Sequence, residues 1–171
     1  MPSPETILLR NLLSPLKSKN MKKKMLVITA ILFFTGVLYF IALCNNTSLV
    51  KPKVNEYYNA LKTTLQDRGY KPNLMIISTK RFKWFNNLLV IFNGAATNSR
   101  HVKCEAIDFI VFDINGDGSA NSKDVDIAYE ILDKEIIKNK GGIGTYKEES
   151  NFFNKQMIHI DCRGKYGRWH R

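Results

Sequence analysis

His101, Asp108 and His159 carry the side chains best suited to chemistry in this chain of 171 residues. Imidazole nitrogen and carboxylate oxygen are zinc ligands, and a hydrolytic zinc site takes three protein ligands and leaves its fourth position for water. His101 stands seven residues before Asp108, which fits a turn followed by a strand, and His159 lies in the apolar stretch "QMIHID". The alternative is that His101 belongs to a surface turn and His159 is a half-buried strand residue bonded to backbone. The residue types alone leave both interpretations open.

Such side chains need rigid elements to aim them, and the spacing of apolar residues predicts these elements. A helix is predicted over residues 54–68, where apolar side chains recur at helical spacing and Gly69 follows as a stop. Strands are predicted over residues 73–79, 105–112 and 156–161, and further helices over residues 82–92 and 122–137. Because these elements mix without a regular strand-helix-strand rhythm, we expect a small α+β domain.

Residues 25–44 form a run of 20 residues without a charge, the length that a helix needs to cross the hydrocarbon core of a bilayer. Six Lys and Arg precede the run against one acid, so the positive-inside rule places residues 1–24 in the cytoplasm and sends the rest across. We therefore expect a membrane-anchored domain in the periplasm or at the cell surface. The alternative is a cleaved signal peptide, which makes the domain a secreted one.

The predicted organisation is a basic cytoplasmic N-terminus (1–24), a transmembrane signal anchor (25–44), a polar tether (45–53) and one folded domain (54–171). The net charge of +11 owes much to the first 44 residues, which hold 6 of the 26 Lys and Arg and 1 of the 15 acids. The remaining mixed charge suits an anionic polymer such as a cell wall as well as it suits nucleic acid, so charge alone does not choose between them. Because no nucleic-acid module is recognisable, nucleic acid is not an expected partner.

A second metal-binding pattern is "DINGDGSANSKD", residues 113–124. Oxygen-bearing side chains stand at loop positions one, three, five, nine and twelve, and Gly118 stands at the sixth, where an EF-hand loop turns sharply. The expected calcium ligands are Asp113, Asn115, Asp117, Ser119 through its carbonyl, Asn121 and Asp124. The loop resembles those of dockerin modules, but a strand enters it in place of a helix. The alternative is a hydrophilic turn between strand and helix.

Taken in order, the motifs resemble a known family, the zinc D-alanyl-D-alanine carboxypeptidases and L-alanyl-D-glutamate endopeptidases, which share their fold with hedgehog signalling domains. The matching motifs are "S-x-H" with "A-x-D" (Ser99, His101, Ala106, Asp108) and a later "H-x-D" (His159, Asp161). "ISTKRFKWFNNLL" resembles the strand, turn and helix that carry a substrate-binding arginine, and "GGIGTY" and the terminal "RW" recur in a cell-wall branch. The resemblance covers residues 54–169.

The resemblance implies a small antiparallel sheet with flanking helices and a zinc ion held by His101, Asp108 and His159. It implies hydrolysis of peptide bonds in peptidoglycan stem peptides, with Arg81 and Ser99 binding the substrate. The guanidinium of Arg81 suits a carboxylate of such a peptide. Gln156 is a departure, since it stands where many members carry an acidic general base. Asp161, on the same strand face as His159, is either the replacement base or a carboxylate that orients a ligand.

Cys104 is a second departure, because it stands where the family usually has glycine. Cys104 and Cys162 each follow a proposed histidine ligand by three residues. If the two motifs meet at one metal, the thiols are either close enough for a disulfide in an oxidising exterior or a pair of buried free thiols. The function we expect is a membrane-anchored zinc peptidase. The competing class is a catalytically weak or inactive relative that serves as a calcium-stabilised module for binding cell wall or a protein. The sequence does not give the bond cut or the oligomeric state.

Overall fold

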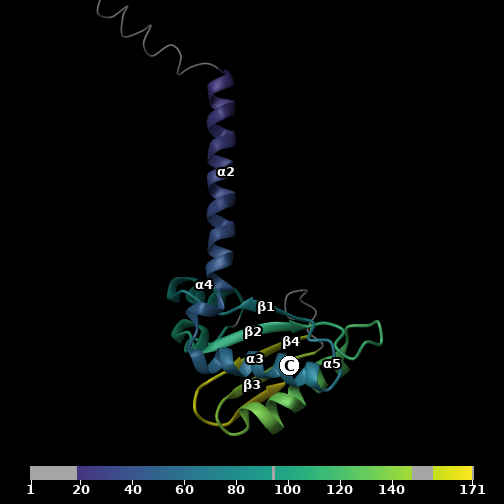
Figure 1. Cartoon of the computed structure of the whole chain (residues 1–171). Coiled ribbons are helices and arrows are strands. Elements are labelled where there is room, and N and C mark those ends of the chain that lie inside the picture. Colours follow the sequence, from purple (N-terminus) through teal and green to yellow (C-terminus); the bar gives the residue numbers. More distant parts are fainter. Residues whose placement is uncertain (1–18, 94, 148–155, 171) are drawn as a thin grey trace, which may run out of the picture. The chain divides into compact units, whose positions relative to one another are not determined.

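The computed structural model describes residues 19–93, 95–147 and 156–170, and it divides into two units, Met1–Ala42 and Leu43–Arg171. Most of the first unit is the long helix α2 (Lys19–Cys44), whose residues 21–44 are long and apolar enough to cross a membrane (Figure 1). Its apolar side chains are exposed, unlike those of a core helix. By its length and composition this helix could be a membrane span or a signal sequence. Residues 1–18 of the predicted cytoplasmic segment lie outside the described residues.

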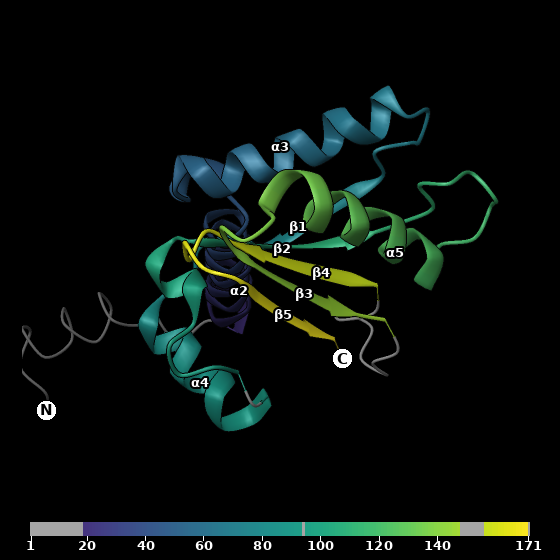
Figure 2. The same ribbon diagram turned by 90° about the horizontal axis from the view of Figure 1, so that it is seen from below.

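The second unit is an α+β domain around one five-stranded sheet in the order β1-β2-β4-β3-β5 (Figure 2). The strands are β1 (Leu74–Ser78), β2 (Ala106–Val111), β3 (Gly142–Tyr146), β4 (Met157–Asp161) and β5 (Gly167–His170). Three of the neighbouring pairs are antiparallel, but β3 and β5 are parallel, so the expected antiparallel sheet is in fact mixed. Because β2 and β3 occupy both edges of β4, β5 pairs with the open edge of β3. The chain reverses between the end of β4 and the start of β5, so β5 runs antiparallel to β4 and therefore parallel to β3.

The helices are α3 (Pro52–Asp67), α4 (Lys83–Asn93) and α5 (Ser122–Ile131), which continues into the π-helical turn η4 (Leu132–Ile137). Short 3-10 turns form at η2 (Thr47–Leu49) and η3 (Arg100–Lys103). α3 and α5 cover the same face of the sheet (Figure 2). Between them and the sheet lies the hydrophobic core, whose fully buried members include Val54, Leu61, Leu65, Ile107, Phe109, Ile131, Ile158 and Ile160.

The sequence predictions for elements are confirmed for every strand and helix named, with the ends displaced by a residue or two in most cases and the last turns of 122–137 being π-helical. Two strands were missed: β3 is rich in glycine and β5 is four residues long. Residues 45–53, expected as a tether, include η2 and the buried Val50. This segment therefore packs on the domain.

The face of the sheet opposite α3 and α5 carries a row of paired residues across all five strands. The row runs through Ser78, Asp108, His159, Gly144 and Trp169, each in register with the next. Since successive strand residues point to opposite faces, burying Ile107 and Phe109 in the core turns Asp108 to the other side. The same alternation in β4 turns His159 to that side.

Candidate metal centre

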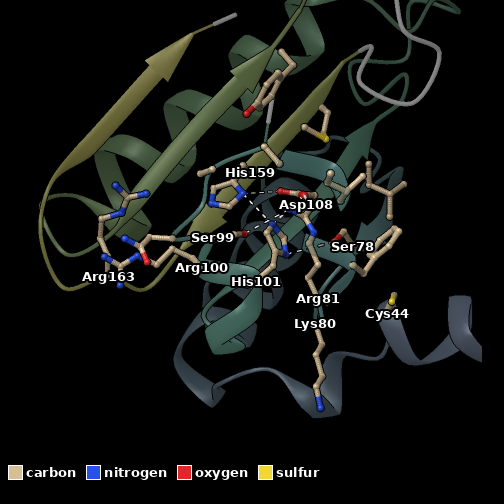
Figure 3. Close-up of a pocket in the computed structure, with 18 of the residues that line it drawn as sticks. Cys44, Ser78, Lys80, Arg81, Ser99, Arg100, His101, Asp108, His159 and Arg163 are labelled. Carbon is tan, nitrogen blue, oxygen red and sulfur yellow. Dashed lines mark hydrogen bonds and ion pairs between the residues drawn. The ribbon is translucent and has the colours of Figure 1, made fainter. Parts of the chain in front are cut away.

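His101, Asp108 and His159 meet on this open face of the sheet, and one potential ligand atom of each lies within 4.8 Å of the others (Figure 3). His101 Nε2 is 3.0 Å from Asp108 Oδ2 and 3.3 Å from His159 Nδ1, and His159 Nδ1 is 2.6 Å from Asp108 Oδ1. The three side chains come from η3, β2 and β4. The grouping predicted from the sequence is thus present, and it could hold a metal ion.

His101 is oriented by a backbone contact at one of its ring nitrogens. Its Nδ1 donates a hydrogen bond to the Thr79 carbonyl at 2.7 Å, and because a carbonyl only accepts, this nitrogen carries the proton. Nε2 is left to face Asp108. The turn that presents the ring is short because Cys104 closes it with a left-handed backbone, φ 56°, which is a conformation that glycine adopts more easily.

His159 lies between two carboxylates. Its Nδ1 faces Asp108, and its Nε2 is 3.3 Å from Asp161 Oδ2. Burial disfavours charge on the ring, but the two carboxylates outweigh it and raise the pKa of His159 to about 9. With Asp161 accepting from Nε2, the nitrogen available to a metal is Nδ1.

Asp161 is fully buried and its oxygens are heavily engaged. Oδ1 accepts from the backbone N–H groups of Gly142 and Arg163 at 3.1 and 3.0 Å, and the Arg163 guanidinium binds both oxygens. Burial would raise the pKa of this carboxyl, but His159 and Arg163 hold it well below its usual range. A carboxylate in this setting is typical of one that orients a histidine ligand.

Asp108 is the carboxylate at the centre of the group. Burial opposes its charge, yet the two facing histidines hold its pKa well below its usual range. Arg81 Nη2 lies 3.7 Å from its Oδ2. The same guanidinium makes long contacts to Asn86 Oδ1 at 3.4 Å and to Ser99 Oγ at 3.5 Å, which leave it donors for an anionic ligand.

A cavity of about 740 Å³ opens over the group. Four cationic side chains line it, namely Lys80, Arg81, Arg100 and Arg163. Among the described residues, Asp108 is the one acid in its lining. Arg100 and Arg163 are partly neutralised by Glu105 and Asp161. The cavity nevertheless favours an anionic ligand.

Trp169 forms one wall of the site. This role was not predicted from the sequence. The Trp169 ring centroid is 5.2 Å from that of His159, and its Nε1 donates to Tyr146 Oη at 3.2 Å. A Cβ on Gly144 would come within 2.2 Å of the Trp169 ring, so only glycine fits beneath it. The role of Arg163 was also missed. Two features of the sequence could have indicated these roles: the alternating glycines of "GGIGTY" for Trp169, and the position of Arg163 two residues beyond Asp161.

Gln156, the residue in the family's position for a general base, is turned away from this cavity. It has a left-handed backbone, φ 58°, and its amide donates to the Ala120 carbonyl. The geometry therefore keeps its side chain out of the described lining of the cavity.

The predicted calcium loop, residues 113–124, is closed by hydrogen bonds of its own. Asp113 accepts from the backbone of Gly116 and Gly118. Asp124 is fully buried, accepts from Ile114 and Asn115 through Oδ1, and forms a capping box with Asn121 at the start of α5. Across the residues that the structure describes, His101, Asp108 and His159 are the one group of three whose ligand atoms converge. Calcium binding stays a prediction without support from this geometry.

Cys104 and Cys162 are both free and half-buried, so the structure shows neither the disulfide nor the pair of buried thiols, and their pairing stays a prediction. The Cys162 N–H donates to the Glu105 carbonyl at 3.0 Å, which brings the two segments side by side. Burial raises the pKa of Cys162 and keeps the thiol protonated, whereas the thiolate is the form that reacts.

Compared with protein-family models, with curated proteins and with solved structures, the chain gives no match in any of the three. What can be said of the site's chemistry follows from the residues themselves.

Proposed function

We propose that this chain is a membrane-anchored, extracytoplasmic zinc peptidase that hydrolyses peptide bonds in peptidoglycan stem peptides. The observation that carries the proposal is the convergence of His101, Asp108 and His159 under an open cavity. Two imidazoles and one carboxylate are a donor set that suits zinc better than magnesium or calcium, which prefer oxygen alone. A zinc ion there would supply a Lewis acid for the scissile carbonyl and a bound water of lowered pKa.

The contribution of the protein to this chemistry is to orient the two histidine rings. Thr79 fixes the proton of His101 on Nδ1, and Asp161 accepts from His159 Nε2, so that one nitrogen of each ring faces Asp108. Such supporting contacts set the direction and basicity of ligands. They support a set of ligands that is prearranged beside the cavity.

The cationic lining supports an acidic peptide as substrate. A stem peptide ends in a carboxylate, and the planar fork of Arg81 matches that group with two parallel hydrogen bonds. Arg81→Lys keeps the charge and loses the fork, so kcat/KM for a stem peptide should fall about tenfold or more. Arg68→Lys, at an exposed ion pair with Glu135, is the matched control.

One observation favours a second candidate, a relative that binds cell-wall peptides without cutting them. Asp161 is saturated by Arg163 and Gly142, and Gln156 points elsewhere, so neither is poised as a general base. Among the described lining residues there is no other acid besides the ligand Asp108.

Metal analysis of the full chain, combined with digestion of purified peptidoglycan, decides between these functions. We expect about one zinc ion per chain and release of stem-peptide fragments. His159→Ala should lose both, whereas His170→Ala, whose ring contacts Thr145 Oγ1, should lose neither. Bound zinc without hydrolysis favours the binding module. A chain that takes up no zinc rules out the peptidase.

A further inference from the structure

Helix α4 presents a row of large apolar side chains to solvent. Trp84, Leu88, Ile91 and Phe92 are 58, 43, 73 and 82% exposed, and their spacing puts them on one face of the helix. We call these four residues the apolar face of α4. α4 lies apart from α3 and α5 (Figure 2), so burial in the core does not account for them. A contiguous exposed apolar surface of this kind marks a binding surface.

Other residues of α4 face the domain. Asn86 is buried and donates to the Ala96 carbonyl, while Phe85 and Leu89 line the cavity over the metal centre. The helix is therefore one wall of the cavity, and its apolar face is the outside of that wall.

The position of α4 along the chain indicates what covers this face. The carbonyl of Cys44, the last residue of α2, accepts hydrogen bonds from both the N–H and the Oγ1 of Thr79, each at 2.6 Å. α4 begins at Lys83, four residues after Thr79. Even fully extended, that connection reaches only about 14 Å. If α2 spans a bilayer, α4 starts close to the point where the chain leaves it.

The composition around α4 fits a bilayer surface. Residues 80–93 contain Lys80, Arg81 and Lys83 and no acid. Basic residues beside a face of Trp, Phe and Leu are typical of helices that lie in the headgroup layer, where Trp is enriched. That layer is roughly 6 Å deep on each side of the hydrocarbon core, enough to take the side chains of one helix face.

We infer that the apolar face of α4 is seated in the outer headgroup layer of the bilayer that α2 crosses. The inference rests on the anchoring part of the proposed function and is independent of zinc and of hydrolysis. Because the same helix walls the cavity, seating it places the cavity at the membrane surface. The accessible substrates are then peptides close to that surface.

Fluorescence of Trp84 in the full chain tests the inference. The chain has two tryptophans, so Trp169→Phe leaves Trp84 as the reporter. In vesicles of phosphatidylethanolamine and phosphatidylglycerol, its emission should shift to the blue and be quenched by lipids brominated near the headgroup. Adding Ile91→Glu and Phe92→Glu should abolish the quenching and, because both side chains are exposed, leave the melting temperature of the chain unchanged.

The matched control is Phe112→Glu, which also places a charge on an exposed aromatic, 40% accessible. Phe112 follows the far end of β2, where Val111 pairs with Leu74, whereas Thr79 adjoins the other end of β1. The two ends are about 17 Å apart at the rise of a strand, so this variant should keep the quenching. Loss of quenching in both variants would overturn the inference.

Two further outcomes would also overturn it. One is Trp84 emission that lipid bromination does not change although α2 withstands carbonate extraction from the vesicles. The other is a disulfide between two copies carrying Ile91→Cys, again without quenching by lipid, which would assign the face to a second chain. Failure of zinc binding or hydrolysis leaves these readouts untouched, so the two proposals fail separately.

Discussion

At the scale of single residues, the centre depends on a histidine whose two nitrogens serve different carboxylates. His159 gives Nδ1 to Asp108 and Nε2 to Asp161. The three candidate ligands could be located from the sequence because they stand in recognisable motifs. It did not reveal that Arg163 holds Asp161, because a cation two residues away along the chain is ordinary and its direction depends on the fold.

Zinc binding should depend steeply on pH. Without metal, the pKa of His159 is raised to about 9 from an ordinary 6.5, so at pH 7 the ring is protonated and an ion at Nδ1 must displace that proton. We expect about one proton released per zinc at pH 7 and affinity that rises about tenfold per pH unit up to about 9. Calorimetry in buffers of different ionisation enthalpy measures the release.

The metal-free chain should show the opposite trend. The charged His159 stabilises the fold fully below about pH 6.5, and this contribution is lost as pH rises through about 9, because the raised pKa favours the protonated folded state. The melting temperature of metal-free protein should therefore fall over that interval. A His159→Ala chain whose melting temperature falls equally would contradict the assignment.

Asp161→Asn separates the two roles considered for this carboxylate. The change removes the charge that holds His159 Nε2 and leaves Arg163 without its partner. We expect zinc affinity to fall about 10- to 100-fold, as for other supporting carboxylates, with a lower melting temperature. Competition with a chromogenic chelator measures the affinity. Lost turnover at unchanged affinity would make Asp161 the base instead.

At the scale of elements, the strands that the sequence missed are the ones that complete the site's wall. β3 and β5 bring Gly144 and Trp169 into register beside His159. Glycines lower the strand propensity of β3, and β5 is too short for a pattern to emerge. Partners several strands apart cannot be read from a local pattern.

Gly144→Ala should disturb this wall. The added Cβ would lie 2.2 Å from the Trp169 ring, so the ring or the strand must move. We expect a loss of about 1–3 kcal/mol of stability, read as a lower melting temperature, and weaker zinc binding through His159. Because Trp169→Ala removes the clash, the double variant should lose less than the sum of the two changes. Strict additivity would mean that the two residues do not meet.

The loop over residues 113–124 offers a test of calcium. Asp124 caps α5 and is fully buried, so Asp124→Ala should cost about 1–2 kcal/mol of stability with or without calcium. Asp117 is an exposed loop residue whose oxygens accept from Ser119 and Asn115. Asp117→Ala should lower the melting temperature mainly if calcium binds. Melting curves with and without about 5 mM calcium decide: a calcium-dependent rise in the parent that Asp117→Ala abolishes supports the site.

At the scale of the whole molecule, the structures of the two units could be predicted from the sequence to different extents. The apolar helix was found from length and charge alone, because a candidate membrane span is recognised by its composition and not by its packing. The α+β class of the domain followed from the order of elements. The parallel β3–β5 pair did not, since it depends on which sheet edges remain open.

Retention of the anchor is the prediction at this scale. If α2 is a span, the chain made in bacteria should stay in the membrane through carbonate extraction at its full mass of 19.7 kDa. A cleaved signal sequence would give a shorter, soluble product. Immunoblotting of both fractions with a C-terminal tag distinguishes these outcomes.

The row of paired residues across the sheet should allow the metal at the centre to be removed and replaced. Asp108 and His159 stand directly opposite each other on hydrogen-bonded strands, so the sheet itself holds their Cβ atoms at about 5 Å. The spacing exists before any ion arrives. Folding and metal uptake are then separate events, unlike those of a zinc finger. A chelator should empty the site and leave the domain intact, and the emptied chain can be reloaded with a different ion to report on the chemistry there.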